Sequence, residues 1–182
     1  MVLPIYLYGN KVLKQKGKDI GPDFPALHKL IEDMWDTMYF ASGVGIAAPQ
    51  IGLPIRLFVV DSTPYYEDKD VQKGIKKVFI NAEILEEFGK EWAFEEGCLS
   101  IPKIHAEVRR TTHVRIKYLD ENFIPHEEVF DEINARVIQH EYDHIDGILF
   151  VERVAPVRRQ LLMRKLAKIQ KGQYEAKYPV KV

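Results

Sequence analysis

The sequence is poor in the features that stabilise secreted proteins or insert proteins into membranes. Its 182 residues include one cysteine, Cys98, so no internal disulfide can form. A chain of this kind is typical of a reducing compartment. No apolar run is long enough to span a bilayer, and the N-terminal residues lack the basic start and continuous apolar stretch of a signal peptide. We therefore expect a cytoplasmic protein with no membrane partner.

The sequence also has no excess of charge of one sign, but its charges are unevenly distributed. The formal net charge is −1. From Arg153 onward there are nine Lys and Arg residues and one acidic residue, which gives this part a charge of +8 and leaves −9 for the rest. A basic segment of this kind either contacts an anionic partner or forms a solvated helix face.

No repeat, low-complexity tract or break in composition divides the chain. The sequence is 46% hydrophobic and 29% charged, which is typical of a globular protein and excludes a disordered one. We therefore predict a single catalytic domain over residues 1–182.

Three segments carry apolar residues at helical spacing. The first covers 25–40, with Pro25 suited to the first turn, and the second begins at Asp131, which can cap it, and ends near residue 146. The third covers about 156–171 and is rich in Lys and Arg. Its predicted apolar side consists of Val157, Leu161, Leu162, Leu166 and Ile169.

Strands are predicted between the first two helices. Short β-branched runs at 56–60 and 77–80 indicate strands, with the polar segment 61–76 as an exposed connection. Apolar residues alternate at 114–118 as in a half-buried strand, and 123–130 can return antiparallel beside it. The order of helix, strands, helix and helix predicts an α+β fold.

The most informative motif is His140-Glu141-Tyr142-Asp143-His144, inside the second predicted helix. The spacing of four residues places both imidazoles on one helix face, where both can bind one metal ion. Glu141 lies beside them and can accept a proton from metal-bound water. The fold is then expected to pack small antiparallel or mixed sheets around this central metal-binding helix, with helices near the N- and C-termini. The alternative to a metal-binding motif is an ordinary amphipathic helix in which the two histidines and Glu141 coincide by chance.

A catalytic metal site of this type needs a third protein ligand. No histidine follows His144, and the single cysteine lies in the turn-like segment Glu95–Pro102. A lone Cys98 is most simply a small buried hydrophobe. Beside two paired histidines and in a reducing compartment, a thiolate ligand is the better interpretation.

Three segments carry a resemblance to a known family. Gly43–Gln50, Glu96–Ser100 and Gln139–His144 resemble the three motifs of the peptide deformylases, in the order and with the separations of that family. The resemblance covers nearly the whole chain. It implies an enzyme that removes the formyl group from the N-terminal formylmethionine of nascent polypeptides and releases formate. It also implies one divalent metal ion held by Cys98, His140 and His144.

The resemblance assigns further roles by motif position. Glu141 would act as general base and then general acid on metal-bound water. The backbone N–H of Leu99 and the side-chain amide of Gln50 would stabilise the oxyanion. Gln50 can instead simply tie down the glycine-rich segment through backbone hydrogen bonds.

An apolar pocket is needed for the methionine side chain. One turn and two turns before His140, Val137 and Ile133 lie on the same helical face, and Ile46 and Phe94 are expected opposite them. Each of these four can also be plain core. The resemblance further implies that the backbones of Gly45 and Gly97 pair with the substrate like a neighbouring strand.

Some positions depart from the family or fall outside its motifs. Well-known members have Arg where this chain has His105, so the resemblance does not assign the substrate contacts around His105. Arg110 matches a basic position that pairs with a carboxylate at the position of Glu96, so we expect an ion pair there. The role of segment 61–76 cannot be read from the sequence.

The metal and the further partners follow from the resemblance alone. The family generally uses Fe²⁺, while a donor set of one cysteine and two histidines also accepts Zn²⁺, Ni²⁺ or Co²⁺. The basic helix at 156–171 resembles a C-terminal helix that can dock on the ribosome. N-formylmethionyl peptides are the expected substrates, and DNA is not an expected partner.

Two other functions share part of this pattern. A zinc metalloprotease or aminopeptidase has the same histidine motif but usually takes a third ligand downstream, where this chain offers only Asp146 and Glu152. A metal-stabilised ribosome- or RNA-binding module would explain the basic segment, but structural sites normally close with four protein ligands. The Cys98 motif disfavours the first alternative, and the lack of a fourth Cys or His at a suitable spacing disfavours the second.

Overall fold

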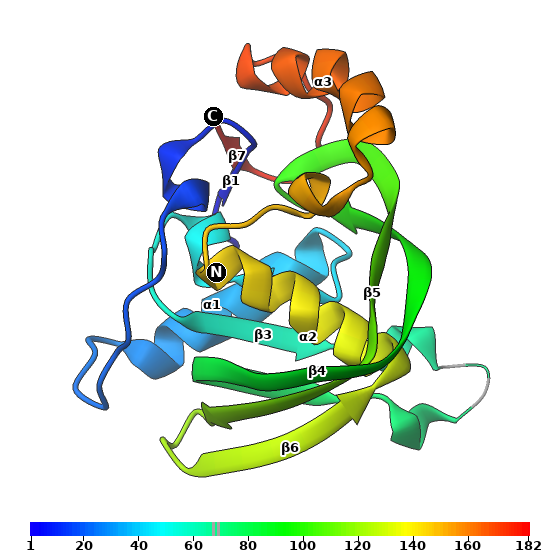
Figure 1. The fold of residues 1–182 in the computed structure, drawn as a ribbon. Coiled ribbons are helices and arrows are strands. Elements are labelled where there is room, and N and C mark those ends of the chain that lie inside the picture. The colour runs from blue at the N-terminus through cyan, green and yellow to red at the C-terminus, as the bar shows by residue number, and fades with distance from the viewer. Residues whose placement is uncertain (67, 69) are drawn as a thin grey trace.

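The computed structural model describes residues 1–66, 68 and 70–182. Over these residues the chain forms an antiparallel five-stranded sheet, a two-stranded parallel sheet and three α-helices (Figure 1). The strands of the large sheet lie in the order β2 Gly45–Ala47, β3 Leu57–Asp61, β4 Lys76–Cys98, β5 Ile101–Leu119 and β6 Pro125–Asp131. The small sheet pairs β1 Ile5–Tyr6 with β7 Val180–Lys181, and the helices are α1 Leu27–Phe40, α2 Glu132–Ile145 and α3 Pro156–Gln170. The predicted α+β class is confirmed.

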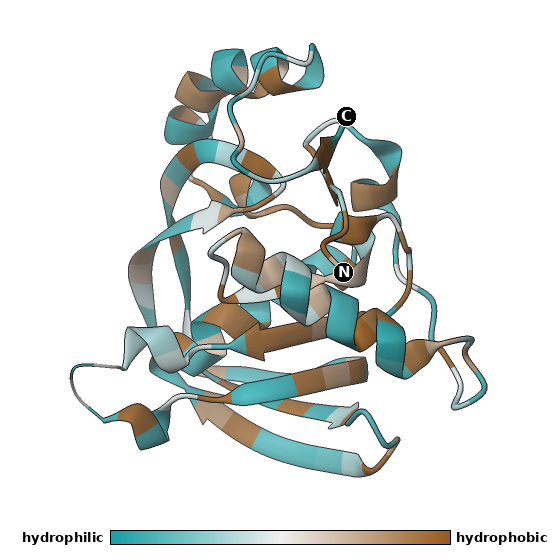
Figure 2. Cartoon of the chain, turned by 180° about the vertical axis from the view of Figure 1, so that it is seen from behind, coloured by the Kyte–Doolittle hydropathy of each residue, from teal (hydrophilic) through white to brown (hydrophobic). Residues whose placement is uncertain are grey.

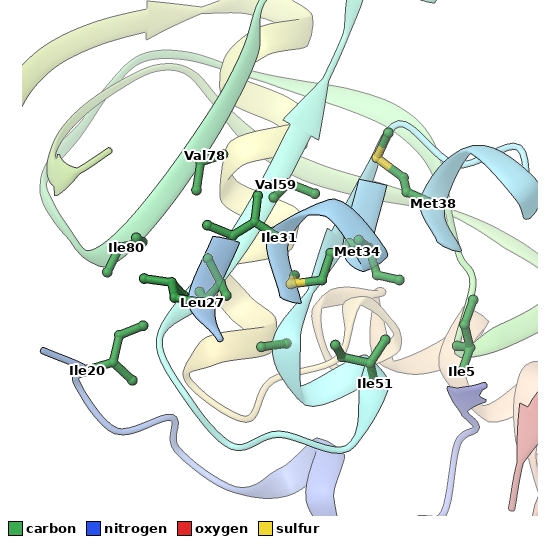
Figure 3. Close-up of a cluster of buried hydrophobic side chains, with 13 residues drawn as sticks. Ile5, Ile20, Leu27, Ile31, Met34, Met38, Ile51, Val59, Val78 and Ile80 are labelled. Atoms are coloured by element: carbon green, nitrogen blue, oxygen red, sulfur yellow. The ribbon is translucent and has the colours of Figure 1, made fainter. Parts of the chain in front are cut away.

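Strand β3 explains how the large sheet is covered on both sides. Its side chains alternate between two faces, and the first four, at 57–60, are apolar and fully buried. Leu57 and Val59 belong to a core cluster that includes the buried face of α1 (Figure 3). Phe58 and Val60 belong to a second cluster that includes residues of α2. The sheet is therefore held between α1 and α2.

Helix α2 is buried along most of its length because it packs against β2, β3, β5 and β6. Ten of its fourteen residues are buried, including polar ones. Asp131 occupies the N-cap position, but its side chain makes no capping hydrogen bond. The helix ends as predicted, with Asp146 as C-cap followed by Gly147 at φ +75°. Tertiary packing rather than capping therefore fixes this helix.

Strands β4 and β5 are much longer than the sequence predicted. The predicted runs at 77–80 and 114–118 are only the ends of these strands that lie inside the sheet. Beyond them the two strands continue as a curved hairpin that extends from the sheet toward α3 (Figure 1). Four register shifts interrupt the pairing, and these shifts disturb the alternation of polar and apolar residues by which strands are recognised.

The first helix begins later than predicted. It starts at Leu27, and Pro25 lies in the turn that precedes it. Ala26 is the N-cap residue with a left-handed backbone at φ +53°, which separates the proline from the helix. Apolar and polar segments alternate along α1, as a helix with one buried side requires (Figure 2).

The predicted apolar side of the third helix is only partly buried. Leu166 and Ile169 are buried in a third core cluster, and Leu162 is partly buried against it. Val157 and Leu161 are 76% and 75% exposed. The reason is that α3 lies at one end of the molecule, above the bend of β4 and β5, and contacts the body mainly through its C-terminal half (Figure 1).

The polar segment between the first two predicted strands connects β3 to β4, which pair from Leu57↔Ile80 to Asp61↔Lys76. Its described part contains two short 3₁₀ turns, at Thr63–Tyr65 and Val71–Lys73. Residues 67 and 69 lie outside the described residues. No helix in the described part of the chain is long and apolar enough to cross a membrane.

Candidate metal centre

Helix α2 places the two motif histidines one turn apart on the same side. The ring centroids of His140 and His144 are 5.2 Å apart. Cys98 ends β4 next to them, and its Sγ lies 3.3 Å from His144 Nε2. The three potential ligand atoms all lie within 4.8 Å of one another.

These three donors fit a transition-metal ion. Sulfur and nitrogen ligands that share a tetrahedral ion at about 2.0–2.3 Å lie roughly 3.4–3.6 Å apart, close to the separation of Cys98 and His144. Three protein ligands leave one coordination position for water or substrate. Burial keeps the pKa of His144 well below its ordinary value, so its ring is neutral and can donate a lone pair.

Glu96 orients the first histidine from behind. Its carboxylate accepts a 2.8 Å hydrogen bond from His140 Nδ1 and bonds of 2.8 and 3.1 Å from Arg110. Arg136 Nη1 donates a further bond of 2.8 Å. Burial opposes the charge of Glu96, but the bonds from His140 and Arg110 outweigh it and hold the pKa of this carboxyl well below its usual range. The buried Glu96 carboxylate therefore fixes the orientation of the His140 ring through Nδ1 and leaves Nε2 available to bind a metal ion.

The same buried charges connect α2 to the hairpin and to the segment after it. Arg110 Nη1 also donates to Asp143 at 2.8 Å. Asp143 accepts two further bonds, of 2.5 and 2.6 Å, from Arg153. The expected pair of Arg110 and Glu96 is present, but Arg136, Asp143 and Arg153 were not anticipated from the sequence.

Glu141 follows His140 on α2 and lines the same cavity as His140 and Cys98. It is 4% exposed, and its Oε2 has no hydrogen-bond partner among the described residues. Burial, its largest effect, raises the pKa of Glu141 to about 7. A Cβ atom on Gly45 would lie 2.6 Å from Glu141 Oε1, so any other residue at this position would displace the carboxylate from where it lies. A carboxyl held there can both accept and donate a proton.

Gln50 ties down the glycine-rich segment and also points toward the turn that follows Cys98. Its Oε1 accepts a 2.9 Å hydrogen bond from the Ala47 N–H, which ties down the glycine-rich segment. Its Nε2 donates to Ser100 Oγ at 3.2 Å and lies 3.5 Å from Cys98 Sγ. The amide is therefore fixed at one end and directed at the cysteine turn at the other.

A cavity of 670 Å³ opens at this cluster. Most of the predicted site residues line it: Gly45, Gln50, Phe94, Gly97, Cys98, Leu99, Val137, His140 and Glu141. Two predicted pocket residues do not line it in the described structure. Ile46 is fully buried in the core with α1, and Ile133 packs against the cluster between the sheet and α2. Helical spacing from His140 was therefore not enough to place Ile133 at the cavity.

Sequence reasoning missed residues that the fold brings to the cavity from elsewhere. Tyr65, from the connection between β3 and β4, lies against Phe94 in an edge-to-face arrangement at 6.3 Å. Tyr178 arrives from the C-terminal segment. His105 faces Gly97 across the hairpin, where a Cβ on the glycine would lie 2.6 Å from the imidazole ring. Only the last of these has a signal in the sequence, the departure from the family noted above.

The carboxylates that a peptidase of this type would use are engaged elsewhere. Asp146 Oδ1 accepts a 2.7 Å hydrogen bond from Arg56, and Glu152 accepts bonds of 2.7 and 2.6 Å from Lys14. Neither residue belongs to the group of three donors found among the described residues.

Comparisons with known proteins find matches over most of this chain. A model of the polypeptide deformylase family matches residues 2–160. The peptide deformylase of Christiangramia forsetii is 49% identical over 188 residues, covering 100% of this chain and 96% of the relative. That of Flavobacterium johnsoniae is 48% identical with the same coverage. The crystal structure of a peptide deformylase from Legionella pneumophila superposes with a TM-score of 0.81 at 39% identity, over 95% of this chain and 98% of that one.

We predict that Glu96→Gln weakens metal binding by about 10- to 100-fold, because an amide neither holds His140 as firmly nor balances the two arginines. The measurement is the metal dissociation constant, obtained by competition with a chromophoric chelator. Glu95→Gln is the matched control, since Glu95 is the exposed neighbour on the same strand. Equal affinities for the two variants would contradict the orienting role of Glu96.

Proposed function

The chain belongs to the peptide deformylase family, whose metal-dependent members remove the formyl group from the N-terminus of nascent polypeptides, and we propose that Cys98, His140 and His144 hold the metal here. The chain accordingly removes the formyl group of N-formylmethionyl peptides and releases formate. The observation that supports the assignment of residues is that the three donor atoms lie within 4.8 Å of one another, and that two of the donors, Cys98 and His140, line one cavity with Glu141 and Gln50. Residues 1–182 then act as one catalytic unit.

A divalent ion at this site would supply Lewis acidity, which makes water nucleophilic near neutral pH and polarises the formyl oxygen. The fit of the donor set does not select one metal. We propose Fe²⁺ as the physiological ion on the basis of the family resemblance. Zn²⁺, Ni²⁺ and Co²⁺ are the other ions that this donor set accepts.

Glu141 moves the proton. Its unpaired Oε2 lies buried at the cavity, where it can take a proton from the attacking water. It then delivers this proton to the amine as the bond to the formyl carbon breaks. A carboxyl whose pKa is raised toward neutrality by burial suits both halves of that task. The products are formate and a free α-amino group.

Two donors of the chain address the charge that develops on the formyl oxygen. The Leu99 N–H has no acceptor among the described residues, and Leu99 lines the cavity beside Cys98. The Gln50 amide is held by Ala47 and Ser100 and reaches the same turn. Donors fixed in advance toward a developing oxyanion stabilise the transition state without reorganisation.

The walls of the cavity account for the choice of substrate. Val137 and Phe94 provide apolar surface next to the ligands, as a methionine side chain requires. The backbones of Gly45 and Gly97 are free of side chains and can pair with the substrate main chain, which reads no sequence. Ile46 and Ile133 support these walls from the core instead of lining them.

Helix α3 is the proposed contact to the ribosome. Its exposed surface combines basic residues with the apolar side chains of Val157 and Leu161. Lysine and arginine contacts to RNA phosphates supply affinity without sequence specificity and weaken as salt increases.

We predict that Glu141→Gln lowers kcat for formate release from formyl-Met-Ala by about 100- to 10,000-fold while metal content changes little. Glu132→Gln, on the exposed first turn of the same helix, is the control and retains full activity. Undiminished turnover by Glu141→Gln would exclude the general-base role. Cleavage of internal peptide bonds without formate release would overturn the proposed function itself.

We predict that protein purified without oxygen contains iron and is most active per mole of iron, and that this activity declines in air. Elemental analysis combined with specific activity measures this directly. Zinc-loaded protein with equal or greater activity per metal would contradict the assignment of Fe²⁺.

We predict that replacing Arg158, Arg159, Arg164 and Lys165 together by Gln reduces cosedimentation with ribosomes at low salt by more than 10-fold and leaves formate release from free peptides unchanged. The full chain should lose the same binding as salt rises. Equal binding by the substituted and unsubstituted proteins would exclude α3 as the contact.

A further inference from the structure

The segment after α3 forms part of the wall of the cavity. Residues 173–179, named here the C-terminal strap, lead from α3 to β7 (Figure 1). Four of them line the cavity: Glu175, Ala176, Lys177 and Tyr178. The end of the strap is fixed by the N-terminal segment, because Ile5 N–H donates to the Pro179 carbonyl at 2.9 Å and Leu7 N–H to that of Lys181 at 2.7 Å. The family model ends at residue 160, so the strap lies outside its match.

The strap contacts the turn between β4 and β5. Cys98 pairs with Ile101, so Leu99 and Ser100 are the two residues that reverse the chain. Tyr178 donates a 2.7 Å hydrogen bond to the Leu99 carbonyl, 79 residues away in sequence. The Tyr8 N–H donates to the Ser100 carbonyl at 2.8 Å. Both carbonyls of the turn are therefore held by residues from the two ends of the chain.

We infer that Tyr178 is a positioning residue of the deformylation reaction, because its hydroxyl fixes Leu99 so that the Leu99 N–H faces the formyl oxygen. This inference rests on the proposed role of Leu99 as an oxyanion donor. Tyr178 itself acts only through the turn and is not a catalytic residue.

The contacts around Tyr178 make such positioning effective. Its ring packs against the core cluster beneath α1, so it is not a freely rotating surface side chain. Burial first, and then the neighbouring Cys98, raise the pKa of Tyr178 to about 12, which keeps the hydroxyl protonated as a donor. On the other side of the turn, the Leu99 side chain already lies so close to Gly43 that a Cβ there would be 2.9 Å from it. The turn is thus held from the strap and from the glycine-rich segment together.

An oxyanion donor depends on its direction. Displacing a catalytic group by a fraction of an ångström is enough to reduce its contribution. Without the Tyr178 hydroxyl, the Leu99 carbonyl loses the hydrogen bond that holds it. The two-residue turn can then change its orientation more freely. The loss should affect the transition state, in which the oxyanion exists, more than the bound substrate.

The test is Tyr178→Phe in the full chain, with Tyr174→Phe as the matched control. Tyr174 is on the same strap but packs against the third core cluster and does not line the cavity in the described structure. We expect Tyr178→Phe to lower kcat for formyl-Met-Ala by about 3- to 10-fold, as loss of one hydrogen bond implies, with KM changed by less than about 2-fold. Amide hydrogen exchange in the peptide that contains Leu99 and Ser100 should accelerate in this variant, with or without added metal.

The outcomes separate this inference from the proposed function. If the unsubstituted protein releases no formate, the proposed function fails. If it does, and Glu141→Gln does not, kcat decides the role of Tyr178. An unchanged kcat for Tyr178→Phe overturns the inference, and so does an equal fall in Tyr174→Phe. A lower kcat with a matching loss of thermal stability, or a change confined to KM, also overturns it, because the hydroxyl then supports the fold or the substrate rather than the turn.

Discussion

One buried carboxylate, Glu96, accepts hydrogen bonds from His140, Arg110 and Arg136 at the same time. A buried ion of this kind costs several kcal/mol in lost hydration, so it persists only where partners surround it on every side. Meeting that requirement brings β4, β5 and α2 together at one point. Asp143 extends the network to Arg153, in the segment that leads from α2 to α3. The positions of the proposed metal ligands His140 and Cys98 therefore depend on how these charges are paired.

The fold was predictable where local pattern and tertiary environment agree. The helices around residues 27–40 and 132–145 show helical spacing because one face of each packs on the sheet. The central part of β4 and β5 could not be recognised in the same way, since the hairpin leaves the sheet and its register shifts four times. The apolar side of α3 could be predicted, but its burial depends on where the helix lies, and Val157 and Leu161 remain exposed.

The site was predictable to the extent that its residues belong to short motifs. The histidines and Glu141 lie on one helix, so their spacing alone specifies their relative geometry. Cys98 could be inferred as the third ligand because it is the single cysteine and no histidine follows His144, but nothing in the sequence says that the end of β4 meets α2. Arg136 and Tyr178 carry no local signal: their roles arise from contacts with residues that are distant in sequence. Ile133 shows another limit. The spacing of residues on a helix indicates which face a side chain is on, but not whether that face borders a cavity or the core.

The uneven distribution of charge has a consequence for how the molecule meets other bodies. The part of the chain from Arg153 onward has a charge of +8 against −9 for the rest, and α3, which carries six of its nine basic residues counting Lys171 at its C-cap, lies at one end of the molecule (Figure 1). A net charge near zero therefore coexists with a large electric dipole. The electric field of a polyanion rotates the molecule before contact, so that α3 points toward the polyanion and the acidic remainder points away from it. Such a torque selects the orientation of the first collision even where the net attraction is small.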